Sequence, residues 1–177
     1  MDELDESLCI FDEKYFAPRP GPENFSDPIL SQPLSSVSLE ERWILLLKQG
    51  VAYKSAGAFE NAAFKFCNAA RTCRITGKGK LELCLFKAAE TYYALAEAMQ
   101  SVGMISSSFN ASECGLERAK QAKCPYLVVW LAVMCADVLC MRADQQFFPS
   151  LQYTSAMEVL LPGLQQVIGG IPYGVSL

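Results

Sequence analysis

The chain has 177 residues, of which 51% are hydrophobic and 19% are charged. This apolar fraction excludes a generally disordered chain, and the length suffices for one hydrophobic core without disulfide support. Residues 1–40 hold nine acidic and two basic side chains, whereas residues 41–177 hold ten acidic and thirteen basic ones. The larger segment therefore has a small cation excess, which argues against nucleic acid as the main partner.

The eight cysteines could indicate a secreted disulfide framework, but the N-terminus does not support that interpretation. It is acidic, Met1-Asp2-Glu3-Leu4-Asp5, and lacks the basic and apolar pattern of a signal peptide. Most of the cysteines fall on the apolar sides of predicted helices, where a free thiol behaves as a small hydrophobic group. We therefore expect free thiols and a cytoplasmic location, with the nucleus as the alternative.

Five prolines between residues 18 and 33 predict an extended tail or strap over residues 1–37. The folded part then opens with Ser38-Leu39-Glu40-Glu41, which has the form of a capping box and predicts a helix that starts at Ser38. That helix ends at Gly57, and an antiparallel second helix begins at Phe59 and ends before Thr76-Gly77-Lys78-Gly79. A third helix, residues 81–102, carries two apolar faces, which predicts contacts on two sides.

The later helices are less regular. Ser106-Ser107-Ser108 predicts the cap of a fourth helix that runs through Lys123, and Gly115 with few large apolar residues predicts an exposed outer member. Pro125 starts a fifth helix that is apolar on all sides through Met141, which is typical of a buried core helix. It is shorter than the ~20 apolar residues of a membrane span and contains Asp137.

The start of the last helix is open between two positions. It begins either near Phe147 or Ser150, or at Ser155, where Ser155-Ala156-Met157-Glu158 forms a second capping box. Five residues are expected to make apolar contacts there: Leu151, Met157, Leu160, Leu161 and Leu164.

These elements predict an all-α fold of about six antiparallel helices, stacked as three hairpins, with an extended N-terminal tail. Residues 1–37 form the acidic, proline-rich tail or strap, residues 38–168 the helical-hairpin domain, and residues 169–177 an irregular C-terminal tail.

One hairpin, residues 43–74, resembles a tetratricopeptide repeat. The family places large, small and aromatic residues and a glycine on the first helix, and alanines around an aromatic on the second. At the family's spacing these roles fall on Leu46, Gly50, Tyr53, Gly57, Ala62, Phe66 and Ala69.

Two positions depart from the pattern, Gln49 where the family prefers leucine and Arg74 where it prefers proline. Gly103 follows Gly57 by 46 residues instead of the family's ~34. Such longer hairpins are similar to the soluble NSF attachment protein branch. The resemblance implies a stacked scaffold that assembles proteins.

The sequence offers little chemistry for catalysis. It contains no histidine, which removes the commonest general base and most zinc sites, and it has no CxxC motif. Gly77-Lys78-Gly79-Lys80 lacks the spacing of a phosphate-binding loop. We therefore expect no enzymatic activity and no catalytic, cofactor or metal site.

Two sets of residues are candidates for binding a protein partner. In the acidic tail, apolar side chains stand among acids, as in segments that dock on folded proteins, although a disordered, solubilising tail has the same composition. They are Leu8, Ile10, Phe11, Tyr15 and Phe16. The second set is a basic cluster that could receive an acidic segment of a partner or this chain's own tail, or could be a solvated face. It comprises Lys65, Arg71, Arg74, Lys78, Lys80 and Lys87.

The expected function is a non-enzymatic interaction scaffold, an adaptor or a subunit of a stable complex. The alternative is a peripheral membrane or vesicle-trafficking factor, suggested by the attachment-protein likeness, the basic cluster and the apolar helix over residues 126–141.

Overall fold

The computed structural model describes residues 27–144, 154–162 and 165, and this part of the chain is helical without a strand. A further helix spans residues 154–162. The predicted all-α class is confirmed. The named elements are the 3-10 helix η1 (Leu34–Ser36) and the α-helices α2 (Arg42–Ser55), α3 (Phe59–Thr76), α4 (Leu81–Ser101), α5 (Ile105–Gln121) and α6 (Pro125–Asp144).

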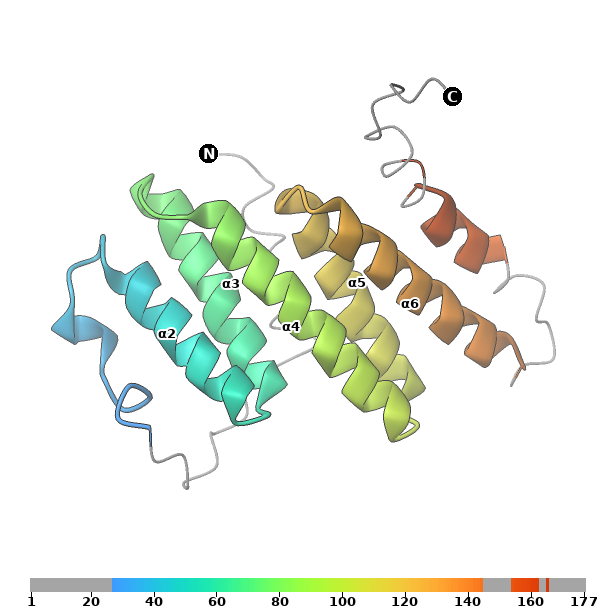
Figure 1. Cartoon of the computed structure of the whole chain (residues 1–177), viewed down its shortest axis with the longest axis horizontal. Helices are drawn as coiled ribbons and strands as arrows, with labels where there is room; N and C mark the ends of the chain where they lie inside the picture. Colours follow the sequence, from blue (N-terminus) through green and yellow to red (C-terminus); the bar gives the residue numbers. More distant parts are fainter. Residues whose placement is uncertain (1–26, 145–153, 163–164, 166–177) are drawn as a thin grey trace, which may run out of the picture.

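The helices zigzag between two layers. In Figure 1, α2, α4 and α6 lie nearer the viewer, and α3 and α5 lie behind them. Each helix packs against the next along the chain, and α4 also contacts α6. As the two apolar faces of residues 81–102 predicted, α4 packs on both α3 and α5.

Three of the turns share one backbone geometry. Gly57, Gly103 and Lys123 have positive φ angles of 76°, 77° and 53°, the left-handed conformation that ends many helices. Gly57 thus ends the first helical segment as predicted. In each turn the next amide donates to a carbonyl five residues back: Ala58 to Tyr53 (2.9 Å), Met104 to Met99 (2.9 Å) and Cys124 to Ala119 (3.1 Å).

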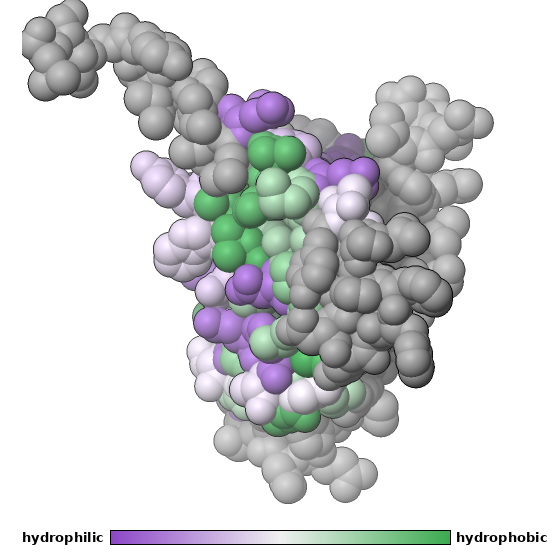
Figure 2. All heavy atoms as spheres, turned by 90° about the vertical axis from the view of Figure 1, so that its right-hand side faces the viewer, coloured by the Kyte–Doolittle hydropathy of each residue, from purple (hydrophilic) through white to green (hydrophobic). Residues whose placement is uncertain are grey.

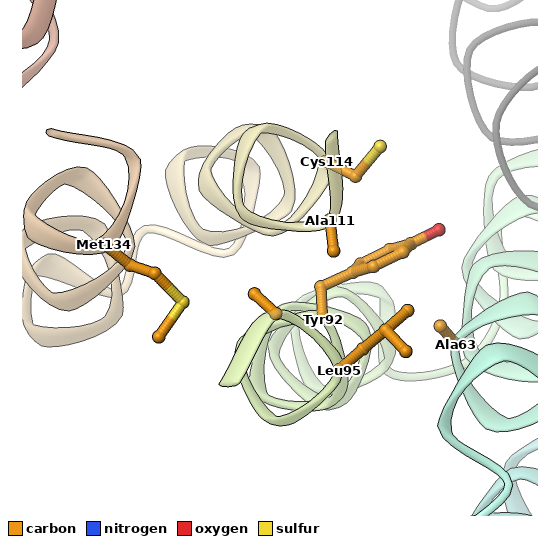
Figure 3. Close-up of a cluster of buried hydrophobic side chains, with 7 residues drawn as sticks. Ala63, Tyr92, Leu95, Ala111, Cys114 and Met134 are labelled. Atoms are coloured by element: carbon orange, nitrogen blue, oxygen red, sulfur yellow. The ribbon is translucent and has the colours of Figure 1, made fainter. Parts of the chain in front are cut away.

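The core follows the zigzag, and Tyr92 of α4 lies near its centre with 1% of its surface exposed. Figure 3 shows the Tyr92 ring between Ala63 of α3 and Ala111 of α5, and Met134 of α6 belongs to the same cluster. Because small residues face this ring on both neighbouring helices, the helices approach closely enough to enclose it.

Two predicted helix starts are wrong. The first long helix begins at Arg42, because the Ser38 hydroxyl donates to Glu41 Oε2 (2.8 Å) instead of capping a backbone amide. Residues 38–41 form a turn there. The serines at 106–108 lie inside α5, whose N-cap is Met104 without a side-chain hydrogen bond. Ser108 instead donates to the carbonyl of Ala96 in α4 (2.9 Å).

The prediction that α5 is an exposed outer helix is also wrong. It lies between α4 and α6 and buries Ala111, Cys114 and Ala119 completely. A Cβ at Gly115 would come within 2.9 Å of Tyr92 Cβ and 2.8 Å of a Leu131 methyl. The small side chains that weakened the apolar pattern in the sequence are therefore the reason that α5 packs so closely.

The hydrogen bonds of Gln49 explain why glutamine stands where the repeat pattern prefers leucine. Its side chain is 2% exposed, and Nε2 donates to the carbonyls of Ile29 and Gln32, both at 3.0 Å. Oε1 accepts no hydrogen bond from the described residues. The amide therefore fastens the strap before η1 to α2, a role that leucine cannot fill.

Replacing Gln49 by leucine should release this strap. Two hydrogen bonds are lost, partly offset by removal of the unpaired Oε1, so we expect the free energy of unfolding to fall by about 1 kcal/mol. Amide exchange over residues 29–37 should become faster at the same time, as measured by mass spectrometry. The matched change Gln100→Leu on α4 should leave exchange in this segment unaltered. Unchanged exchange in Gln49→Leu would show that something else holds the strap.

Candidate interaction surfaces

Four exposed apolar side chains lie on one side of α6. Tyr126 is 77% exposed, Trp130 58%, Val133 41% and Met141 40%. Spacings of four, three and eight residues place them on one side of a helix, and we call these four residues the α6 face. The opposite side is buried, through Val128, Leu131, Cys135 and Val138. The prediction that this helix is buried all round is therefore wrong.

The 154–162 helix packs beside α6 and also exposes apolar side chains. Figure 2, which views the molecule from the side of α6 and this helix, shows apolar side chains gathered there. Ala156 packs against Ala136 and Leu139 of α6, and Leu160 joins this contact as predicted. Met157 and Leu161 are exposed and do not belong to this cluster, so their predicted apolar contacts stay predictions.

The helix already includes Thr154, which excludes Ser155 as its cap. The predicted contacts of Leu151 and Leu164, and the alternative starts at Phe147 and Ser150, lie outside the described residues.

Side chains of α4 border the α6 face. The rings of Tyr93 and Trp130 are 5.7 Å apart and tilted by 47°. The Tyr93 hydroxyl donates to Glu97 Oε1 (3.3 Å), and Gln100 Nε2 lies 3.5 Å from the sulfur of Met141. Because these contacts connect α4 with both ends of the face, the face is part of the packed structure of the two helices.

Acidic groups occur within this apolar surface. Asp137 is exposed and lies seven residues after Trp130 and four before Met141, which places it on the same side of α6. Glu97 is exposed on α4 beside Tyr93. The surface is therefore apolar and aromatic with a negative charge on each helix.

The six predicted basic residues do not form one cluster. Lys65 and Arg74 are nine residues apart on α3, which places them on opposite sides of a helix. Burial lowers the pKa of Lys65, whereas Arg74 Nη2 donates to Gln121 Oε1 on α5 (3.3 Å). These two side chains therefore cannot hold the same ligand group.

Two others of the six predicted basic residues form salt bridges with acidic side chains. Lys78 binds Glu40 (2.6 Å), and Lys87 binds Glu90 (3.0 Å), which also binds Lys54 of α2 (2.9 Å). Burial opposes ionisation of Glu90, but hydrogen bonds from both lysines outweigh it and lower the pKa of this carboxyl group.

Arg71 and Lys80 are exposed. Of the six predicted residues, Lys78 and Lys87 are thus paired with acids, and Lys65 and Arg74 lie on opposite sides of α3. The tail candidates Leu8, Ile10, Phe11, Tyr15 and Phe16 lie outside the described residues.

The seven cysteines within the described part are free thiols, as predicted, and four are buried. Cys73 of α3 and Cys84 of α4 are hydrogen-bonded to each other, and burial together with the charge of Cys73 raises the pKa of Cys84 to about 12. Burial raises the pKa of Cys135 to about 11. Because the thiolate is the nucleophile, neither cysteine is poised to react near neutral pH.

Alkylation should follow this difference. At pH 8 and in the native protein, we expect iodoacetamide to modify Cys84 and Cys135 at least about 10-fold more slowly than the partly exposed Cys124 and Cys140. Peptide mass spectrometry gives the rate at each position, and denaturation with guanidinium should abolish the difference. Equal rates in the native protein would contradict the described packing of α4 and α6.

No group of three histidine, cysteine or acidic side chains suitable for a metal ion occurs in residues 27–144 and 154–162. One of the described helices, α6, is long and apolar enough to cross a membrane, with a mean hydropathy of 1.6 over Pro125–Arg142, a property that core helices share. Comparisons with protein-family models, with curated proteins and with solved structures give no match to this chain.

Proposed function

We propose that this protein is a non-enzymatic scaffold, an adaptor or complex subunit of the cytoplasm that binds another protein through its stacked helices. The α6 face carries the proposal. Large exposed apolar patches on folded domains commonly mark binding sites, and tryptophan and tyrosine are enriched among the residues that dominate binding energy. The tetratricopeptide-like residues of the first hairpin support the same proposal, since such stacks serve as binding scaffolds.

Affinity purification of the full chain from cells tests this function. The double variant Tyr126→Ser with Trp130→Ser should lose proteins that the unaltered chain retains. Val51→Ser is the matched control, because Val51 is an exposed apolar residue of α2, away from the α6 face. Proteins retained equally by all three forms, or by none, would contradict the proposal.

A peripheral membrane or vesicle-trafficking role is the second candidate, favoured by the apolar length of α6. Asp137 weighs against insertion of the α6 face into lipid, because a carboxylate in hydrocarbon is strongly unfavourable. Flotation with phosphatidylcholine and phosphatidylserine vesicles separates the two candidates. The membrane role requires co-flotation that Trp130→Ser abolishes.

A further inference from the structure

We propose that the α6 face binds an amphipathic helix of a partner protein whose apolar stripe is flanked by lysine or arginine residues. This inference rests on the proposed function and specifies its partner by chemistry.

The dimensions of the face fit a helix. Tyr126 and Met141 are separated by 15 residues of α6, about 22 Å along the helix axis at the usual rise of 1.5 Å per residue. A partner helix of about four turns covers this length and presents apolar side chains every three or four residues. Trp130, next to Tyr93, provides a large aromatic contact about one helical turn from the Tyr126 end of the face.

The carboxylates of the surface indicate which side chains the partner helix carries beside its apolar stripe. Glu97 on α4 and Asp137 on α6 are both exposed, and Glu97 is tied to Tyr93, which in turn contacts Trp130. Asp137 lies in line with Trp130 and Met141, and Glu97 lies beside Tyr93 on α4. Long side chains that border the apolar stripe of a bound helix can reach both carboxylates. Lysine or arginine there gains favourable pairing, whereas glutamate or aspartate meets like charge.

The same charges disfavour the chain's own tail as the occupant. The apolar residues between Leu8 and Phe16 are accompanied by Asp12 and Glu13 and preceded by Asp5 and Glu6. A segment of this charge would place carboxylates beside Asp137. We therefore do not assign the tail to the α6 face.

Synthetic peptides test the partner chemistry directly. Three fluorescein-labelled helical peptides share one leucine stripe and differ only in flanking residues, which are all lysine, all glutamine or all glutamate. Fluorescence anisotropy with the purified full chain gives each dissociation constant. We expect the lysine-flanked peptide to bind at least about 10-fold more tightly than the glutamate-flanked one. Trp130→Ala should weaken its binding by about 10-fold or more, and Val51→Ala should not.

Charge reversal separates pairing on the face from general attraction to an acidic protein. Glu97→Lys combined with Asp137→Lys should reverse the preference in favour of the glutamate-flanked peptide. Glu40→Lys combined with Glu117→Lys changes net charge equally at exposed positions elsewhere and should preserve the preference.

The inference is overturned if no peptide binds up to about 1 mM, a free energy near −4 kcal/mol. It is also overturned if the three bind equally, if both charge reversals act alike, or if binding persists in Trp130→Ala. Vesicles that bind through Trp130 in place of the peptides would assign the face to lipid. If the peptides fail while α6-dependent proteins are still retained in affinity purification, the scaffold function stands and only the partner chemistry is wrong.

Discussion

Replacing Phe66 by alanine is expected to lower the free energy of unfolding by about 3–5 kcal/mol. Phe66 of α3 is fully buried, and its ring packs where α2 has Gly50. A Cβ on Gly50 would come within 2.6 Å of this ring, which means that the ring lies directly against the backbone of α2. Because α2 and α3 are already this close, they cannot move together to fill the space that alanine leaves. The cavity therefore persists, and its free energy adds to that of the lost apolar burial.

Urea denaturation followed by circular dichroism measures this loss. Phe64→Ala is the matched control, because it removes the same atoms from a half-buried position two residues away on α3. We expect the control to lose less than half as much stability. Equal losses at the two positions would contradict the close contact of α2 with α3.

Gly115→Val is expected to destabilise the protein by about 3 kcal/mol, mainly through overpacking between α4, α5 and α6. The Cβ alone would lie 2.8 Å from a Leu131 methyl and 2.9 Å from Tyr92 Cβ. The Tyr92 Cβ cannot swing away without moving the α4 backbone. Glycine is ordinarily unfavourable in a helix by up to about 1 kcal/mol relative to alanine, so a loss in Gly115→Ala as well would identify packing as the cause.

Thermal and urea unfolding of the Gly115 variants check this result. Glu117→Val, at an exposed position two residues further along α5, accounts for the lower helix propensity of valine and should change stability by less than about 0.5 kcal/mol. A stabilised Gly115→Ala protein would show that α5 does not approach α4 and α6 as described.

The sequence predicted best where helices carry large apolar residues at regular spacing. The stripes of α3 and α4 gave their bounds to within a residue or so, because leucine and aromatic residues at steps of three and four define a buried side. Gly57 marked its turn because a left-handed residue there favours glycine. Lys123 takes the same conformation without that signal, so its turn could not be recognised in the same way.

The close packing of α5 and the exposed side of α6 were not predicted, because the apolar pattern does not show how much of a helix its neighbours cover. In α5, alanine, serine and glycine reduce the apolar signal although close packing depends on them. In α6, both sides are apolar, and the sequence does not reveal that described neighbours cover only one. Gln49, at a position where the repeat pattern prefers leucine, was the one visible sign of the strap contact. Its partners are the backbone carbonyls of Ile29 and Gln32, which no side-chain pattern encodes.

Site-specific photo-crosslinking tests the central claim most directly. A photoreactive phenylalanine analogue in place of Trp130, in the full chain and in cells, should form covalent adducts with a partner protein, and mass spectrometry should locate the adduct within one helical segment of that partner. The same analogue in place of Val51 should yield at least about 10-fold less of that adduct. Equal yields at the two positions, or no protein adduct at position 130, would contradict a protein-binding role for the α6 face.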